Sequence, residues 1–301
     1  MDVLITGGAG FIGSHVAERF LKEGDRVTIL DNLSAGEKAN VPKGAKFVCM
    51  DVEDRNCEKV FKDGGFDLVI HLAAQISVAA SMEDPHQDAR SNVLGVVNML
   101  ELSRKYRVEK FVYASSAAVY GEKSALPVQE TDELCPKSPY GISKLCGELY
   151  CEKWSEIYQL KTLIFRFSNV YGPRQAAYGD GSVVPSFIKG AVEKTPIRIH
   201  GDGEQTRDFV FVLDLAQWLV QGAKSRLTGI YNLSSNTRHS INELVDTLGQ
   251  LYPELQVIHG PERPGDIRHS VLDSTRLRKG LRLSEGCSFH DGLRITCEAF
   301  R

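Results

Sequence analysis

The chain has 301 residues, of which 42% are hydrophobic and 25% charged, a composition typical of a soluble globular protein with a substantial core. Its formal net charge of -3, without a Lys and Arg block interleaved with aromatic residues, provides no basic field, so we expect no nucleic-acid partner. No apolar stretch approaches the roughly 20 residues of a membrane span, and the first strand-like run follows Met1 too closely for a signal peptide. We therefore expect a cytoplasmic protein without a membrane partner.

The cysteines are scattered along the chain, odd in number and never spaced as Cys-x-x-Cys. This pattern disfavours both a disulfide framework and a zinc site. We expect reduced thiols and no bound metal. The seven positions are Cys49, Cys57, Cys135, Cys146, Cys151, Cys287 and Cys297.

In the first half, short β-branched runs alternate with longer amphipathic segments, the pattern of parallel strands joined by crossover helices. Buried strands are predicted at residues 3–6, 27–30, 46–49, 68–71 and 111–114. Apolar residues at helical spacing predict helices over residues 11–22, 57–61 and 92–106. We therefore predict an α/β fold with a doubly wound parallel Rossmann sheet.

Further along, Ser138 and Pro139 predict a helix start, because Ser caps orphan amides and Pro is tolerated in the first turn. This helix should run toward Tyr158, and a strand is predicted at 163–167. Gly and Pro then become frequent, which indicates a smaller, mixed α/β lobe with a helix over 242–251. We expect a cofactor-binding domain over 1–170 with return segments from about 205–235, a mainly substrate-binding lobe over 171–301, and a cleft between them.

A glycine-rich segment follows the first predicted strand directly. Gly7, Gly10 and Gly13 are spaced G-x-x-G-x-x-G. A strand that turns sharply into a helix needs glycine where a side chain would block the turn or a bound pyrophosphate, and the third glycine lets helix and strand pack closely. Glycines also cluster in ordinary turns, so the strand before them and the helix after them are what favour a dinucleotide site.

Two carboxylates stand at the ends of the next predicted strands. Asp31 is placed to accept a hydrogen bond from the adenosine ribose 2'-hydroxyl and would repel a 2'-phosphate, which favours NAD over NADP. Asp51 suits a contact with the adenine ring. The alternatives are that Asp31 and Asn32 only form a turn and that Asp51 only caps a surface helix.

Tyr140 and Lys144 lie one helical turn apart, so their side chains emerge on the same face of the predicted helix. A neighbouring ammonium and a positive nicotinamide ring would both favour the phenolate form of Tyr140, making it a base near neutral pH. Ser116, after the fifth predicted strand, can hydrogen-bond the same substrate hydroxyl. The alternative for the pair is a half-buried aromatic residue beside a lysine that extends to the surface.

These motifs together resemble those of the extended short-chain dehydrogenase/reductase family, and within it the UDP-glucose 4-epimerase group. The resemblance spans nearly the whole chain. It is carried by residues 6–13, 31–34, 51–52, 71–75, 115–121, 140–144, 166–174 and 207–209.

The resemblance implies that Tyr140 removes the proton of the sugar 4-hydroxyl while C4 gives a hydride to NAD. The resulting 4-keto sugar rotates in the site and is reduced on its other face, so NAD is regenerated. Besides the residues above, the resemblance implies cofactor contacts from Phe11, Ile12, Asn32, Val52, Leu72, Ala73, Ala74, Gln75, Asn92 and Ser115.

Substrate contacts are likewise implied by the resemblance, with the arginines suited to a diphosphate. The alternative for each arginine is a solvated surface charge. Relatives that catalyse dehydration carry acidic residues where this chain has Ala117 and Ala118, so plain epimerisation is favoured. In addition to Ser116 and Tyr140, the implied substrate contacts are Asn169, Val183, His200, Arg207, Arg263, Asp266 and Ser270.

At Ser270 the epimerase pattern often has an aromatic residue that walls off the C2 substituent of the sugar. Serine leaves more room, so we hypothesise that N-acetylated UDP-hexoses are accepted as well as UDP-glucose and UDP-galactose. The alternatives are a UDP-glucuronate 4-epimerase, another NAD-dependent nucleotide-sugar epimerase and, less favoured, a non-catalytic NAD-binding module. The helices over 88–106 and 140–158 resemble those of a four-helix dimer interface in the family, so we expect a homodimer, although the same apolar residues suit packing on the sheet.

Overall fold

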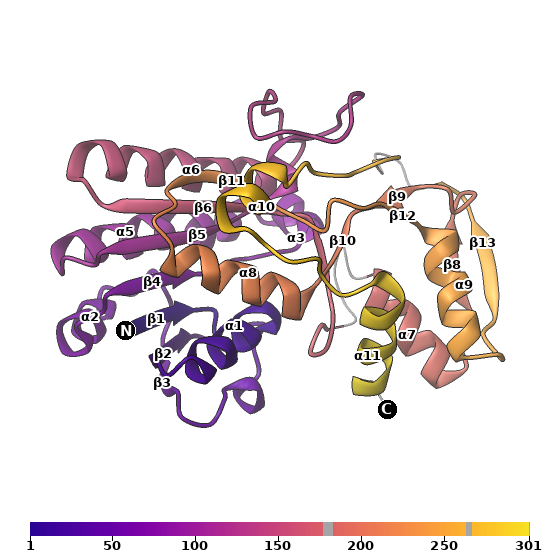
Figure 1. Ribbon diagram of the computed structural model, residues 1–301, viewed down its shortest axis with the longest axis horizontal. Coiled ribbons are helices and arrows are strands. Elements are labelled where there is room, and N and C mark those ends of the chain that lie inside the picture. The colour runs from indigo at the N-terminus through magenta and orange to yellow at the C-terminus, as the bar shows by residue number, and fades with distance from the viewer. Residues whose placement is uncertain (177–182, 263–266, 301) are drawn as a thin grey trace. The chain divides into compact units, whose positions relative to one another are not determined.

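The computed structural model describes residues 1–176, 183–262 and 267–300 (Figure 1). The chain forms two compact units. The first comprises Met1–Gly121, Glu133–Phe167 and Ala216–Tyr231. The second comprises Glu122–Asp132, Ser168–Leu215 and Asn232–Arg301.

A seven-stranded sheet forms the centre of the first unit. Its strands are β1 (Asp2–Thr6), β2 (Arg26–Asp31), β3 (Lys46–Cys49), β4 (Leu68–His71), β5 (Lys110–Ser116), β6 (Lys161–Phe167) and β11 (Gly229–Leu233). They lie in the order β11-β6-β5-β4-β1-β2-β3, and the pairs from β6 to β3 are parallel. Since β1 lies between β2 and β4, the crossovers run in both directions from it, which confirms the predicted doubly wound Rossmann sheet.

Helices cover both faces of this sheet. In Figure 1, α1 (Phe11–Lys22) and α8 (Val212–Lys224) lie on one face, and α2 (Cys57–Gly64), α5 (Gly95–Lys105) and α6 (Pro139–Tyr158) on the other. The second group encloses a core that includes Phe61, Met99 and Phe111. Because both faces are buried, the central strands are nearly continuous runs of apolar residues.

The short segments between β4 and α5, and after β5, lie at the edge of the sheet. They comprise α3 (Val78–Glu83), α4 (Pro85–Ala89), the π-helix η2 (Arg90–Leu94) and the 3-10 turn η3 (Ala117–Val119); a further 3-10 turn, η1 (Lys38–Asn40), follows β2. The helix predicted over 92–106 therefore begins with a π-helical turn instead of running as one regular helix. Such turns occur frequently at functional sites.

The second unit is a smaller mixed α/β structure. Its strands are β7 (Asn169–Tyr171), β8 (Ile197–His200), β9 (Thr206–Arg207), β10 (Phe209–Phe211), β12 (His239–Ser240) and β13 (Val257–Gly260). Its helices are α7 (Val183–Glu193), α9 (Ile241–Leu251), α10 (Thr275–Leu281) and α11 (Phe289–Ala299). The strands pair as β7 with β10, β8 with β13 and β9 with β12. They pack with α7, α9 and α11 around an apolar core that includes Phe187, Leu244 and Leu293.

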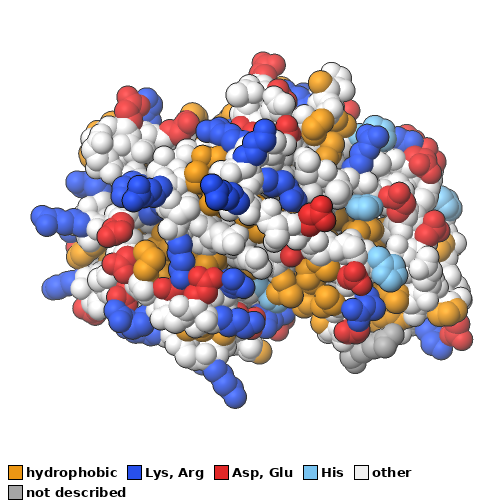
Figure 2. Space-filling view, in the orientation of Figure 1, with side chains coloured by type: hydrophobic (Ala, Val, Ile, Leu, Met, Phe, Trp, Pro, Cys, Tyr) orange, Lys and Arg blue, Asp and Glu red, His pale blue; other side chains and the backbone are white. Residues whose placement is uncertain are grey.

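The surface carries charges of both signs. On the face shown in Figure 2, Lys and Arg side chains are interspersed with Asp and Glu. Across the described ranges, no helix has the length and apolarity to cross a membrane, and no cluster of His, Cys, Asp or Glu is arranged to hold a metal ion. All seven cysteines are free thiols.

Candidate active site

The residues predicted to act in the first unit lie at the carboxyl ends of its strands. Gly7 follows β1, Asp31 ends β2, His71 ends β4 and Ser116 ends β5. In open α/β sheets, ligands bind at the carboxyl ends of the strands. The crevice forms where the strand order reverses, because the connections on the two sides then run in opposite directions. The sheet therefore gathers distant parts of the sequence into one candidate site.

The glycine loop forms the turn that the spacing predicts. Gly7 has φ of +70°, and a Cβ there would lie 2.7 Å from the backbone nitrogen of Ala73. A Cβ on Gly13 would collide with the carbonyl group of Gly7, so the third glycine allows α1 to pack against the loop. Gly10 is the N-cap of α1 and provides no side-chain cap, which leaves the first amides of the helix for an anion. This cradle fits the pyrophosphate of a dinucleotide.

Asp31 ties the loop to β2. One carboxylate oxygen accepts a hydrogen bond from Ala9 N at 3.0 Å, and the other accepts one from Leu33 N at 2.8 Å. The turn proposed as the alternative role is therefore present. It does not exhaust the acceptor capacity of the carboxylate, because each oxygen has two lone pairs, so a ribose hydroxyl can still donate to it.

Asp51 caps no helix, so that alternative is wrong. Its side chain accepts from Asn32 Nδ2 at 2.8 Å and from Glu53 N at 3.1 Å. The helix that follows, α2, has Asn56 as its N-cap. The Asn32–Asp51 pair thus links the ends of β2 and β3, where an adenosine contact is predicted.

The other predicted cofactor contacts surround the same edge. Leu72 N and Ala73 N donate to the carbonyl and hydroxyl oxygens of Thr6, each at 3.2 Å. The Ser115 hydroxyl donates instead to Glu148, a buried carboxylate. The remaining side chains are half-buried at Phe11, Ile12, Ala74 and Gln75 and buried at Val52.

Asn92, on the π-helix η2, is buried and fully engaged with the protein. Its Nδ2 donates to Gln75 O at 2.9 Å, Asp88 Oδ1 at 3.0 Å and Ser143 Oγ at 3.2 Å. Its Oδ1 accepts from Gln75 N at 2.9 Å. Asn92 therefore fixes the loop after β4 against α6, and a direct cofactor contact from its side chain stays a prediction.

Helix α6 begins where Ser138 and Pro139 predict. The Ser138 hydroxyl accepts from Gly141 N at 3.1 Å and caps the helix, and Pro139 is its first residue. Tyr140 N donates to Ser81 Oγ at 3.1 Å, which fixes the first turn against α3. The cap thus places Tyr140 at the start of a rigid helix.

Ser116, Tyr140 and Lys144 come together at the end of β5. Ser116 hydrogen-bonds the side chain of Tyr140. Lys144 Nζ donates to Ala114 O at 2.9 Å and lies 5.9 Å from the centre of the Tyr140 ring. Lys144 therefore bridges from α6 to β5, instead of extending to the surface as the alternative required.

The ionisation of Tyr140 depends on its burial and on two neighbouring groups. Burial raises the pKa of Tyr140 above its ordinary value, the hydrogen bond from Ser116 lowers it, and the charge of Asp88 raises it. Burial also lowers the pKa of Lys144 to about 8, against the opposing carboxylates of Asp88 and Glu148. In the chain alone desolvation is thus the larger effect, and the phenolate expected from the two cations together stays a prediction.

A buried ion pair behind the catalytic residues was not predicted. Glu148, one turn after Lys144, accepts from Arg166 Nε at 2.9 Å and from Arg166 Nη2 at 2.6 Å. Arg166 Nη1 donates to the Tyr120 hydroxyl at 2.9 Å. The pair thus fixes α6 to β6, and the hydrogen bond that Glu148 accepts from Ser115 fixes α6 to the end of β5 next to Ser116.

Apart from Ser116 and Tyr140, the predicted substrate contacts belong to the second unit. Arg207 on β9 pairs with β12, and Ser270 N donates to Thr206 O at 3.2 Å, so Arg207 and Ser270 are on adjacent segments. Asn169 opens β7, where its N donates to Asp208 O at 3.0 Å. Val183 starts α7 against the apolar core, and His200 Nδ1 lies 3.1 Å from Pro261 O. Arg263 and Asp266 lie outside the described residues.

Comparison with known proteins adds to this geometry. Residues 3–234 match the family model described as "NAD dependent epimerase/dehydratase family". A UDP-glucose 4-epimerase from Mycolicibacterium smegmatis is 36% identical, and the alignment covers 100% of this chain and 99% of that protein.

Two solved structures are similar over the whole chain. The UDP-glucose 4-epimerase of Thermus thermophilus, in complex with NAD, has a TM-score of 0.94 at 39% identity and covers 100% of this chain and 99% of its own. The UDP-glucose 4-epimerase of Thermotoga maritima, with UDP-glucose, has a TM-score of 0.96 at 37% identity and covers 100% and 98%.

Proposed function

Because the chain belongs to the NAD-dependent epimerase/dehydratase family, we propose that it inverts C4 of a UDP-hexose and interconverts UDP-glucose and UDP-galactose. The observation that carries the proposal is the meeting of Ser116, Tyr140 and Lys144 at the carboxyl end of β5. The family match confirms the expected family and its NAD dependence. The three relatives described above are all named UDP-glucose 4-epimerases.

The residues of the first unit fit NAD. The glycine loop and the uncapped start of α1 suit the pyrophosphate, and Asp31 suits the adenosine ribose. When bound, NAD accepts the hydride of C4 and returns it. The positive charge of its nicotinamide ring is also the second of the two cations expected to favour the Tyr140 phenolate.

The chain itself moves the proton and holds the substrate. As the C4–H bond breaks, the Tyr140 phenolate accepts the proton of the 4-hydroxyl, and Ser116 hydrogen-bonds the same oxygen. A 4-keto sugar results. When C4 is reduced on its opposite face, Tyr140 returns the proton and the 4-hydroxyl is formed with inverted configuration.

Elimination of water is disfavoured by the residues beside Ser116. Ala117 and Ala118 form the start of η3, and Ser116 Oγ caps that turn by accepting from Ala118 N at 3.2 Å. Neither alanine provides an acid or base for proton transfer at C5 or C6, which dehydration needs. The 4-keto sugar is therefore reduced again instead of losing water.

For the second unit we propose the nucleotide-sugar contacts that the resemblance implies. Arg207 suits the diphosphate through charge-assisted hydrogen bonds, as does Arg263, and Asn169, Val183, His200 and Asp266 complete the proposed set. Ser270 has a small side chain beside β9, so the C2 substituent of the sugar has room for an acetamido group. We propose that UDP-N-acetylglucosamine and UDP-N-acetylgalactosamine are accepted for this reason.

The test is product analysis with purified protein and no added NAD, using UDP-glucose, UDP-N-acetylglucosamine and UDP-glucuronate separately. We expect the C4 epimers of the first two, and turnover without added cofactor indicates retained NAD. Inversion of UDP-glucuronate alone would support the glucuronate alternative, and no turnover after NAD is supplied would support a non-catalytic module.

A second experiment examines Ser270. Ser270→Tyr should selectively reduce turnover of the acetylated pair, because the phenol ring fills the space of the acetamido group. Ser270→Ala, which keeps that space, should leave the ratio of the two activities unchanged. Equal losses on both substrate pairs with Ser270→Tyr would refute the assignment.

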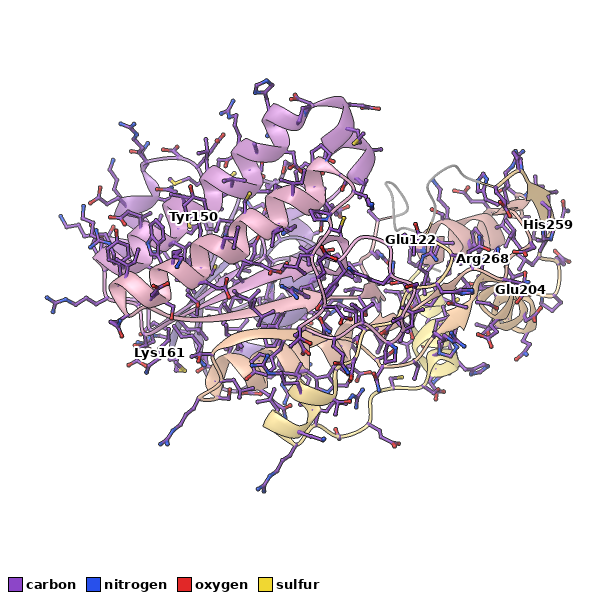
Figure 3. The ribbon with its side chains drawn as sticks, turned by 90° about the horizontal axis from the view of Figure 1, so that it is seen from above. Glu122, Tyr150, Lys161, Glu204, His259 and Arg268 are labelled. Atoms are coloured by element: carbon purple, nitrogen blue, oxygen red, sulfur yellow. The ribbon has the colours of Figure 1, made fainter. Side chains whose placement is uncertain are left out.

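We also propose a homodimer formed through α5 and α6. Several apolar side chains of α6 are exposed, including Ile142 at 52%, Leu149 at 53% and Ile157 at 61%. Tyr150, labelled in Figure 3, starts an edge-to-face row with Trp154 and Tyr158 on the same helix. An exposed apolar surface of this kind is typical of a protein interface.

Sedimentation at micromolar concentration tests the dimer. We expect a dimer for the wild-type chain and a monomer for Leu149→Asp, since a buried unpaired charge would oppose association. A wild-type monomer would contradict the proposal.

We also propose a cytoplasmic location, which the seven free thiols favour because that compartment is reducing.

A further inference from the structure

The segment from Met82 to Leu94 is packed with its polar side chains inward. Asp88 and Asn92 are its only buried residues, each 1% exposed, whereas Met82 is 63% and Leu94 57% exposed. A surface helix ordinarily buries its apolar side. Burying a carboxylate and an amide costs free energy unless they are hydrogen-bonded or paired, so this arrangement points to a role near the site.

Hydrogen bonds connect Asp88 to the catalytic turn. Asp88 Oδ1 accepts from Asn92 Nδ2 at 3.0 Å and from Gln75 Nε2 at 3.1 Å. Asn92 Nδ2 donates to Ser143 Oγ at 3.2 Å, and Ser143 Oγ donates to Tyr140 O at 3.0 Å. The carboxylate is thus linked through two side chains to the backbone of the first turn of α6.

The charge of Asp88 favours the ammonium form of Lys144. Over the described residues, Asp88 forms no ion pair with an arginine or lysine within 4.0 Å, whereas the other nearby carboxylate, Glu148, is paired with Arg166. Lys144 is itself 5% exposed, and burial lowers its pKa to about 8, while Asp88 opposes that change. Glu148 and Arg166 thus form a buried ion pair, whereas the Asp88 carboxylate favours the Lys144 ammonium without forming an ion pair with it.

We propose that Asp88 is a positioning residue of the active site, which orients the first turn of α6 through Asn92 and Ser143 and supplies the buried negative charge that compensates Lys144. The proposal rests on the proposed function, because Lys144 is assigned to the catalytic pair there. On this proposal, the polar side chains of α4 and η2 face inward because they orient the first turn of α6.

Other groups also face Lys144 and Tyr140, and they stay in place when Asp88 is changed. Tyr113 of β5 lies under Lys144, with Nζ 5.3 Å from the centre of its ring. The titratable and charged groups around the pair are Asp88 from α4, Glu148 from α6, Tyr113 from β5, His71 from β4 and Arg166 from β6. Only the part of the Lys144 titration that depends on Asp88 should therefore change in an Asp88 variant.

The test is Asp88→Asn in the full chain, observed by NMR of lysine isotope-labelled at Cε. Lys144→Met assigns the Lys144 signal by its loss. The asparagine keeps the shape and one acceptor oxygen but removes the charge, so the ammonium of Lys144 is less favoured. We expect the Lys144 titration to move to lower pH by about one unit, the order of magnitude for one nearby buried charge.

Two further variants control this measurement. Asp84→Asn removes an exposed carboxylate one turn earlier, and asparagine also serves as an N-cap, so the Lys144 titration should not move. Asp88→Asn/Asn92→Asp exchanges the hydrogen-bonded pair and returns a carboxylate to the same place. This double variant should restore most of the wild-type titration, and it can be measured even where Asp88→Asn fails to fold.

A folded Asp88→Asn chain whose Lys144 titration matches the wild type would overturn the proposal. The proposal also fails if Lys144 in Asp88→Asn/Asn92→Asp titrates at the low pH expected for Asp88→Asn. It fails as well if Asp84→Asn lowers the Lys144 titration by the same amount as Asp88→Asn. None of these readings needs a sugar substrate. The epimerase assignment can therefore fail while the Asp88–Lys144 coupling holds, and the reverse is equally observable.

Discussion

Two buried carboxylates act on Lys144 from different elements, and they differ in their partners. Glu148 on α6 forms two hydrogen bonds with Arg166, whereas Asp88 on α4 accepts from the amides of Asn92 and Gln75. A carboxylate paired with arginine holds its charge and fixes the structure, because arginine does not lose its proton. A carboxylate near a lysine can instead change the pKa of the lysine, which gains and loses its proton. The Glu148 region is thus suited to rigidity and the Asp88 region to chemistry.

The largest effect should come from the catalytic region. Tyr140→Phe removes the proton acceptor, so epimerisation should fall about 10²–10⁴-fold, while the thermal unfolding midpoint stays close to that of the wild type. Tyr150→Phe, an exposed position on the same helix, is the matched control and should retain activity. A large loss of stability with Tyr140→Phe would show that the catalytic region supports the fold as the Glu148 region does.

The next effect tests the rigid region. Arg166→Met leaves Glu148 buried without its cation, and the free energy of unfolding should fall by about 3–5 kcal/mol. The double variant Glu148→Met/Arg166→Met removes both charges and should recover most of that stability, because apolar replacement of a buried pair is often neutral. Denaturant unfolding of the three chains measures this. A double variant no more stable than Arg166→Met would show that the loss does not come from leaving Glu148 buried without its cation.

A third buried carboxylate, in the second unit, differs from Glu148 because neutral groups donate hydrogen bonds to it. Asp208 accepts from Ser235 N at 3.1 Å, Ser235 Oγ at 2.7 Å and Leu272 N at 3.1 Å. Burial raises its pKa from 3.8 to about 6, although these hydrogen bonds lower it. Hydrogen bonds without a counter-charge thus hold the ionised form less well than a cation does.

This shift has a defined sign. Between pH 3.8 and about 6 the folded chain holds the Asp208 proton and the unfolded chain does not, so this contribution to stability is present below 3.8 and lost as pH rises through 6. The difference in unfolding free energy between wild type and Asp208→Asn should change by about 2–3 kcal/mol across that window. A difference that does not depend on pH would refute the assignment.

The first unit could be predicted largely from local sequence. The Ser138 cap, the glycine loop and the buried strands are short-range signals, and the structure confirms α1 over 11–22 and α6 from Pro139 to Tyr158. The second unit was predicted less completely, because its strands are short and pair across long separations, such as β8 with β13. Helices α7, α10 and α11 of this unit were not predicted, since the Gly and Pro residues within and around them obscure the helical periodicity. Helix α8 of the first unit was not predicted either, although Gly222 is its only Gly or Pro.

The charges behind the catalytic pair could be predicted only in part. Glu148 lies one turn after Lys144, so its place on the same helix face was readable, but its partner Arg166 comes from another strand. Asp88 lies among exposed residues, and its burial comes from the packing of α4 against α6 and from its hydrogen bonds with Gln75 and Asn92. Local periodicity does not reveal such a residue.

Epimerisation of UDP-glucose that carries deuterium at C4 tests whether the C4 hydrogen moves as a hydride. If NAD takes the hydrogen of C4 and returns it to the opposite face while Tyr140 handles only the hydroxyl proton, UDP-galactose formed in ordinary water should retain the deuterium at C4. Loss of that deuterium to the solvent would show that C4 is inverted by proton exchange and would contradict hydride transfer.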